Sequence, residues 1–175
     1  MATGLLSELG RKFETDKVDY HSYLPFYEKL FAERKVKRLL EIGIFKGASL
    51  RMWEEYLPEA EIYGFDIDKT TLINEGRIKS FVADQRDKIS LLEAVYDTGV
   101  TGFDVIIDDA FHEPKDQIFC ANVMMKFVEP GGVYVIEDIR AGNKGIVQVG
   151  LNYPSYVVEF ETERLADDRI IIIER

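Results

Sequence analysis

Polar side chains that can bind a cation or move a proton follow two apolar segments of this sequence. They are Asp108, Asp109 and His112 after the first segment, and Glu137 and Asp138 after the second. If the two segments are parallel strands, their carboxyl ends share one edge of a sheet, which is where ligands bind. Carboxylates packed together repel one another unless a cation or protons compensate their charge.

Oxygen ligands favour a hard divalent ion, so Asp109, Glu137 and Asp138 predict a site for Mg²⁺ or Mn²⁺. His112 stands three residues past Asp109 in the sequence, where it can act as a general base. Each acid taken alone would equally fit a solvated loop position that caps a helix. We favour a site because the acids occur together at two strand ends.

A glycine-containing segment, EIGIFKGAS, runs from Glu41 to Ser49 between an apolar run and a helical pattern. The order strand, glycine turn, helix presents backbone N–H groups to a ligand. The spacing E-x-G-x-x-x-G differs from the G-x-G-x-x-G of nicotinamide cofactors. We predict cofactor contacts at Glu41, Gly43, Gly47 and Ser49. An ordinary strand-to-helix turn, with Ser49 as a helix-start residue, is the alternative.

A second apolar run, Ile62 to Phe65, ends in Asp66 and is followed by Asp68. A carboxylate at the tip of a second strand can accept both hydroxyls of a ribose, as Asp66 would here. The glycine loop and this acid resemble a class I S-adenosylmethionine (SAM) methyltransferase. The resemblance implies SAM contacts at Asp68 as well, at Asp84 and Gln85 beside the adenine, and at Asp108 facing the methionine amino group.

The motifs D-D-x-x-H at 108–112 and E-D at 137–138 resemble the metal-dependent sugar O-methyltransferases of macrolide and aminocoumarin antibiotic pathways. That resemblance implies Asp109, Glu137 and Asp138 as Mg²⁺ ligands and His112 as the catalytic base. The stretch from Leu39 to Trp53 and the segment Thr15-Asp-Lys17 also match the style of this family. Ala110 and Phe111 stand where the family commonly has Gly-Ser.

The elements that must position these residues alternate in type. Apolar runs predict strands at about 37–43, 61–66, 78–83, 103–107 and 133–136, separated by helices at about 48–57, 70–76, 87–97 and 114–128. Two short N-terminal helices, Leu5–Phe13 and Ser22–Phe31, flank a polar link. Residues 140–155 look like a loop, and 156–164 with 169–174 predict a hairpin. The expected fold is α/β: a Rossmann-like seven-stranded sheet with parallel strands 1–5, a C-terminal hairpin, and helices on both faces.

Length and composition favour one domain over residues 1–175. The single cysteine, Cys120, lies in an apolar helical pattern and predicts a buried thiol. The N-terminus lacks a signal-peptide pattern and no apolar run could cross a membrane, so we expect a cytoplasmic protein. The net charge of −10, without a basic stripe, argues against a nucleic-acid partner.

These observations predict a SAM-dependent O-methyltransferase that modifies a sugar-like hydroxyl of a small molecule with help from Mg²⁺. The metal would lower the pKa of a hydroxyl that is too weak an acid for a histidine alone. Two alternatives stay open: a SAM-binding protein with degenerate or different chemistry, and a nucleotide- or NAD-binding oxidoreductase. The sequence leaves the oligomeric state open, with a homo-oligomer as one option.

Overall fold

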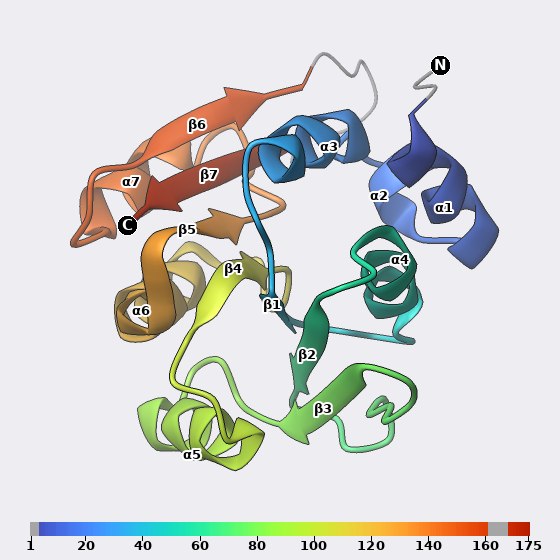
Figure 1. Ribbon diagram of the computed structural model, residues 1–175. Coiled ribbons are helices and arrows are strands. Elements are labelled where there is room, and N and C mark those ends of the chain that lie inside the picture. The colour runs from blue at the N-terminus through green and yellow to red at the C-terminus, as the bar shows by residue number, and fades with distance from the viewer. Residues whose placement is uncertain (1–3, 161–167) are drawn as a thin grey trace.

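A computed structural model describes residues 4–160 and 168–175. In this part of the chain the strands form one seven-stranded sheet in the order β3-β2-β1-β4-β5-β7-β6 (Figure 1). The strands are β1 (Arg38–Ile42), β2 (Glu61–Asp66), β3 (Ile78–Val82), β4 (Phe103–Asp108), β5 (Val128–Ile136), β6 (Tyr156–Glu159) and β7 (Arg169–Glu174). The first five pair in parallel, and β7 pairs antiparallel with both β5 and β6. The predicted seven-stranded α/β sheet, with five parallel strands and a C-terminal antiparallel hairpin, is confirmed.

Helices cover both faces of the sheet (Figure 1). One face carries α1 (Leu5–Phe13), α3 (Leu24–Ala32) and α4 (Ala48–Tyr56), and the other carries α5 (Lys88–Thr98), α6 (Pro114–Met124) and α7 (Lys144–Gly150). The short α2 (Asp16–Asp19) follows α1, and a 3₁₀ turn, η1 (Met125–Phe127), leads into β5. Crossover helices on both faces are what a parallel sheet requires.

The continuous apolar runs of the sequence are explained by burial on both faces. Side chains alternate across a strand, so Ile170 and Ile172 enter the core under α1, α3 and α4, while Ile171 and Ile173 enter the core under α5, α6 and α7. All four are fully buried. Cys120 is also buried in the second core, as predicted.

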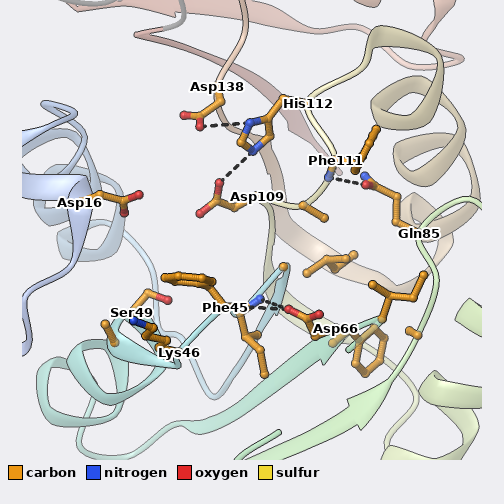
Figure 2. A pocket seen from close by; sticks show the side chains of 18 of the residues that line it. Asp16, Phe45, Lys46, Ser49, Asp66, Gln85, Asp109, Phe111, His112 and Asp138 are labelled. Carbon is orange, nitrogen blue, oxygen red and sulfur yellow. Dashed lines mark hydrogen bonds and ion pairs between the residues drawn. The ribbon is translucent and has the colours of Figure 1, made fainter. Parts of the chain in front are cut away.

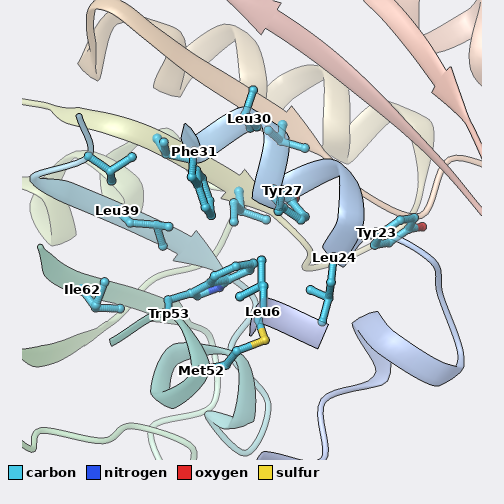
Figure 3. Packing of buried hydrophobic residues seen from close by; sticks show 14 of the residues in the cluster. Leu6, Tyr23, Leu24, Tyr27, Leu30, Phe31, Leu39, Met52, Trp53 and Ile62 are labelled. Carbon is cyan, nitrogen blue, oxygen red and sulfur yellow. The ribbon is translucent and has the colours of Figure 1, made fainter. Parts of the chain in front are cut away.

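An aromatic cluster joins the N-terminal helices to α4 (Figure 3). The Trp53 indole is fully buried and packs edge-on against the rings of Tyr27 and Phe31, with centroid distances of 5.2 and 5.6 Å. Its Nε1 donates a hydrogen bond to Oε2 of Glu41 at 3.1 Å. The cluster therefore holds α3 against the sheet directly behind the end of β1.

The structure corrects four expectations about local structure. Between residue 4 and β1 the structure has three helices rather than two, because the polar link contains α2, whose N-cap Thr15 accepts a hydrogen bond from Lys17 N. Four residues are too few to produce a helical periodicity in the sequence. The predicted second helix begins at Leu24 instead of Ser22.

The helix expected at about 70–76 is absent, and residues 67–77 form turns and loop. The Asp68 side chain accepts hydrogen bonds from both the backbone N–H and the hydroxyl of Thr70. Such local side-chain bonds offer the backbone an alternative to a helix.

The loop expected at 140–155 contains α7 despite its glycines. A Cβ on Gly150 would lie 2.5 Å from Cδ1 of Ile118 in α6, so this glycine permits close packing of the two helices. Tertiary packing overrides the weak helix propensity of the segment.

The predicted hairpin is confirmed by the antiparallel pairing of β6 with β7. Residues 161–164, which we assigned to its first strand, and residues 165–167 of its connecting turn lie outside the described residues. Among the described residues, no helix combines the length and the apolar character needed to span a bilayer.

Candidate active site

The carboxyl ends of the parallel strands meet at one edge of the sheet, and their ladder continues into the loops. Asp109 N donates to Ile42 O at 2.9 Å, and Glu137 N donates to Asp108 O at 3.0 Å. These bonds fix the loops after β1, β4 and β5 relative to one another. A pocket of about 460 Å³ opens at this edge, between the glycine loop and the acids (Figure 2).

Most of the predicted site residues line this one pocket. They are Gly43, Ser49, Asp66, Asp84, Gln85, Asp109, His112 and Asp138. They come from the ends of five strands and from the segments that follow those strands, yet they surround a single volume. The pocket thus opens at the edge of the sheet where the strand ends predict a site.

Gly43 joins the two halves of the pocket. Its φ of +89° lies in the left-handed region, and a Cβ there would sit 2.2 Å from the carbonyl oxygen of Asp109. Only glycine allows the turn after β1 to approach the turn after β4 so closely. The glycine loop and the acidic loop are therefore in backbone contact.

Asp66 anchors the glycine loop from the neighbouring strand. Its Oδ2 accepts hydrogen bonds from the backbone N–H groups of Ile44 at 3.0 Å and Phe45 at 3.2 Å, and its Oδ1 accepts one from Asp68 N at 2.9 Å (Figure 2). Asp66 lines the pocket, whereas Asp68 does not and bonds to Thr70 instead. A carboxylate that lines a pocket and is already oriented is well suited to accept ribose hydroxyls.

Gln85 clips the loop after β3 to the loop after β4. Its Oε1 accepts a hydrogen bond from Phe111 N at 2.5 Å, and its Nε2 donates to Oδ1 of Asp108 at 3.0 Å. Asp108 also accepts from the hydroxyl of Tyr134 at 2.8 Å, and burial raises the pKa of its carboxyl to about 7. Asp108 thus braces the pocket wall from behind.

Five predicted site residues do not line the pocket: Glu41, Gly47, Asp68, Asp108 and Glu137. Gly47 is instead the left-handed N-cap of α4, with a φ of 72°. Period-two alternation explains the two buried glutamates, since each follows the face that the N-terminal helices cover. The cofactor or metal roles of these five residues stay predictions.

The sharpest cluster in the pocket consists of Asp109, His112 and Asp138, whose potential ligand atoms all lie within 4.8 Å of one another. His112 Nε2 is 3.4 Å from Oδ1 of Asp109, and His112 Nδ1 is 3.4 Å from Oδ2 of Asp138. Figure 2 shows the imidazole between the two carboxylates. The sequence predicted that these three residues would converge.

The charges in this cluster depend on one another. Burial raises the pKa of the Asp109 carboxyl, but the Lys17 ammonium and the His112 imidazole outweigh burial and lower that pKa to about 2. Burial lowers the pKa of the His112 imidazole, and the carboxylates of Asp109 and Asp138 reverse the effect, so the pKa lies above its usual value. Without a metal, the cluster therefore favours an imidazolium between two carboxylates.

Glu137 points away from this cluster into the protein. It is fully buried, accepts a hydrogen bond from the Tyr27 hydroxyl at 2.5 Å and forms an ion pair with Lys17. Burial raises the pKa of its carboxyl. Among the described residues, the group of potential metal ligands at this edge does not include Glu137.

Lys17 also lines the pocket, and no role was predicted for it from the sequence. The residue is 1% exposed. Its ammonium lies 2.5 Å from Asp109 Oδ2 and 3.3 Å from Glu41 Oε1, and it also contacts the Glu137 carboxylate. The three carboxylates raise its pKa despite the opposing effect of burial. The one signal in the sequence was the segment Thr15-Asp-Lys17, which resembled the methyltransferase family without a stated role.

The sequence was compared with families and with curated proteins. No family model matches it. It is 35% identical over 144 residues to mycinamicin VI 2''-O-methyltransferase of Micromonospora griseorubida, and 36% identical over 144 residues to demethylmacrocin O-methyltransferase of Streptomyces fradiae. Each alignment covers 77% of this chain and 36% of the relative. The chain thus spans about a third of the length of these curated relatives.

The fold comparison agrees with the sequence comparison. The structure matches the MycE methyltransferase of the mycinamycin pathway, solved with Mg and SAH, at a TM-score of 0.76 and 26% identity, covering 99% of this chain and 55% of that chain. The chain is a homologue of these O-methyltransferases. A further curated relative, 32% identical over 144 residues, is named 8-demethyl-8-alpha-L-rhamnosyl tetracenomycin-C 2'-O-methyltransferase of Streptomyces olivaceus. A complex of the same MycE enzyme with Mg, SAH and mycinamycin VI gives a TM-score of 0.75 at 27% identity.

Proposed function

We propose that this protein is a SAM-dependent O-methyltransferase that acts, with Mg²⁺ or Mn²⁺, on a hydroxyl of a sugar or of a glycosylated natural product. One observation carries the proposal: a single pocket joins the glycine loop and Asp66 to the Asp109–His112–Asp138 cluster. A methyl donor held by the first set would face an acceptor held by the second. The names of the curated relatives support the same chemistry.

The cofactor half of the pocket has the groups that a nucleoside needs. Asp66 would accept the ribose hydroxyls, and the backbone of Gly43 permits close approach of the methionine portion. Gln85 and Asp84 also line the pocket, and Asp84 is held by two hydrogen bonds from the Arg86 guanidinium, at 2.9 and 3.1 Å. These residues would flank the adenine.

The donor set fits a hard divalent cation. Asp109 and Asp138 each direct one carboxylate oxygen at the same volume, and carboxylate oxygens suit Mg²⁺ and Mn²⁺. A bound cation would lower the pKa of an acceptor hydroxyl and fix its position. Asp109 and Asp138 would hold it, while the predicted contribution of Glu137 would require its side chain to leave Lys17 or to share an oxygen.

His112 has the geometry of an oriented general base. Its side chain is 34% exposed and lines the pocket, and each ring nitrogen lies 3.4 Å from a carboxylate oxygen. A cation that takes up one of these oxygens would release the neighbouring ring nitrogen to accept a proton. Asp109 and Asp138 would fix the ring and stabilise the imidazolium that forms when it accepts the hydroxyl proton. The methyl group needs no further activation, because the sulfonium of SAM already activates it, and the protein's task is alignment.

The acceptor is inferred from charge and from the relatives. A net charge of −10 disfavours phosphate-rich acceptors and fits a neutral or cationic small molecule. Because the chain matches about a third of each curated relative, the acceptor, a homo-oligomeric state and a cytoplasmic location all stay predictions.

Calorimetry with SAM, SAH and NAD, followed by mass-spectrometric detection of methyl transfer to a panel of glycosides, tests the proposal. We expect SAM and SAH to bind, and transfer to require Mg²⁺ or Mn²⁺ and to stop with EDTA. SAM binding without transfer to any glycoside would favour a degenerate SAM-binding protein. NAD binding without SAM binding would favour an oxidoreductase and refute the proposal.

A further inference from the structure

Each carboxylate beside His112 has one oxygen facing the imidazole and one held from behind. Oδ1 of Asp109 and Oδ2 of Asp138 face the two ring nitrogens, each at 3.4 Å. The opposite oxygens, Oδ2 of Asp109 and Oδ1 of Asp138, contact residues of the segment 15–27 instead. That segment lies 92 and 115 residues away from the two acids along the chain.

Lys17 holds the first acid. Its Nζ lies 2.5 Å from Asp109 Oδ2, and the side chain is almost fully buried. The same ammonium pairs with Glu41 and Glu137, which fixes its own position between three strand ends. Asp109 therefore has one defined orientation, in which Oδ1 points into the pocket.

Tyr23 holds the second acid. Its hydroxyl donates to Asp138 Oδ1 at 2.8 Å, and its ring is fully buried. The ring stacks on His21, at a centroid distance of 4.8 Å and an interplanar angle of 14°, and His21 Nε2 lies 3.5 Å from the same oxygen. These contacts leave Oδ2 of Asp138 facing His112.

The backbone alone does not favour this orientation. Asp138 adopts a φ of 57°, a left-handed conformation that a residue other than glycine seldom takes. Such a conformation persists when surrounding contacts over-determine it. The contacts of Tyr23 and His21 with Oδ1 are among those that surround Asp138.

We infer that Lys17 and Tyr23 are positioning residues, which present one oxygen of Asp109 and one of Asp138 to His112 and to the cation. The inference rests on the proposed function and extends the active site to the N-terminal segment. A carboxylate with both oxygens free would sample several rotamers, whereas a second partner selects one. Tyr23 is not among the residues that line the pocket. A change at Tyr23 should therefore leave SAM binding intact, and SAM affinity can be measured separately from Mn²⁺ affinity.

The test compares Tyr23→Phe, which removes one hydroxyl, with Tyr63→Phe as a matched control. Tyr63 is 1% exposed and its hydroxyl also donates to a carboxylate, Glu61 at 3.1 Å, away from the site. Mn²⁺ binding is followed by electron paramagnetic resonance, and SAM binding by calorimetry. Tyr23→Phe should weaken Mn²⁺ binding by roughly 10- to 100-fold, the usual effect of losing a partner of a metal ligand. SAM affinity should be kept, and Tyr63→Phe should bind both ligands as the wild type does.

A second readout needs no metal. The chain has two histidines, so ¹⁵N-imidazole spectra of the metal-free protein are simple, and His112→Asn assigns the signals. Tyr23→Phe and Lys17→Met should each shift the His112 signals, and Tyr63→Phe should not. If Lys17→Met fails to fold, Tyr23→Phe decides alone.

The outcomes separate this inference from the proposed function. A Tyr23→Phe protein whose His112 signals and Mn²⁺ affinity both match the wild type overturns the positioning role, even if the wild type transfers methyl groups. A wild type that binds no Mn²⁺ instead overturns the metal in the proposed function. In that case a shift of the His112 signals in Tyr23→Phe still supports the positioning role.

Discussion

Asp66 and Asp68 stand two residues apart at the end of β2, and only Asp66 lines the pocket. We expect Asp66→Ala to weaken SAM binding and Asp68→Ala to leave it unchanged. The Asp66 carboxylate would accept the ribose hydroxyls, and it already holds the glycine loop through Ile44 N and Phe45 N. The substitution removes both effects together.

The size of the loss follows from the type of bond. A hydrogen bond to a charged group contributes about 1.5–3 kcal/mol, which corresponds to roughly a 10- to 150-fold loss of affinity for one ribose contact. Folding should suffer less, because the two released N–H groups border an open pocket and water can satisfy them. A destabilisation of about 1 kcal/mol would lower the melting temperature of a domain of this size by about 2–4 °C.

Isothermal titration calorimetry with SAM measures the affinities, and differential scanning calorimetry checks folding. Asp66→Asn adds a further comparison, because an amide oxygen can still accept from the glycine loop while the negative charge is lost. Equal SAM affinities for the wild type and Asp66→Ala, or equal losses in Asp66→Ala and Asp68→Ala, would refute the placement of the ribose at Asp66.

Three further predictions concern the cluster beside the cofactor. Asp138→Asn should leave the fold intact and abolish activity together with its Mg²⁺ dependence, and full activity of the wild type in EDTA would contradict the metal. His112→Ala should lower the rate by roughly 10²- to 10⁴-fold with SAM binding kept, and the wild-type rate should fall as the imidazole is protonated at low pH; a near-normal variant rate would remove His112 from the mechanism. In the metal-free protein the carboxylates of Asp109 and Asp138 raise the pKa of the His112 imidazole above its usual value. The stabilisation from these ion pairs is therefore fully present below the unfolded pKa of about 6.5 and is lost as pH rises through the folded pKa. Urea denaturation of wild type and His112→Ala should therefore show a difference in unfolding free energy that shrinks with increasing pH, and a constant difference would contradict the ion pairs.

The parts of the fold that depend on periodicity could be predicted from the sequence. The run Ile170–Ile173 is apolar without alternation, as expected of a strand that is covered on both faces, and all four residues are buried. The convergence of Asp109, His112 and Asp138 followed from the same topology, because parallel strands end at one edge. Short sequence segments thus predicted which residues, far apart along the chain, lie close together in the fold.

Short helices and side-chain directions could not be predicted in the same way. The helix α2 has four residues, and α7 depends on the contact of Gly150 with Ile118, which no local pattern records. Glu137 and Asp138 are adjacent in the sequence, yet one faces Lys17 and the other faces His112. Their types suggested one shared role, whereas alternation at the strand end separates them.

Lys17 shows why the N-terminal segment belongs to the site as well as to the core. The ends of β1, β4 and β5 bring three carboxylates, Glu41, Asp109 and Glu137, to one point, and the sheet supplies no cation there. A buried ion pair adds little net stability, because desolvation offsets the attraction of the charges. An apolar residue in place of Lys17 would leave the three carboxylates without this cation, so it would be tolerated only if the acids were replaced as well. Of the three acids only Asp109 lines the pocket, beside His112 and Asp138. The pairing of Lys17 with Asp109 is therefore the contact through which this buried lysine would serve the proposed site.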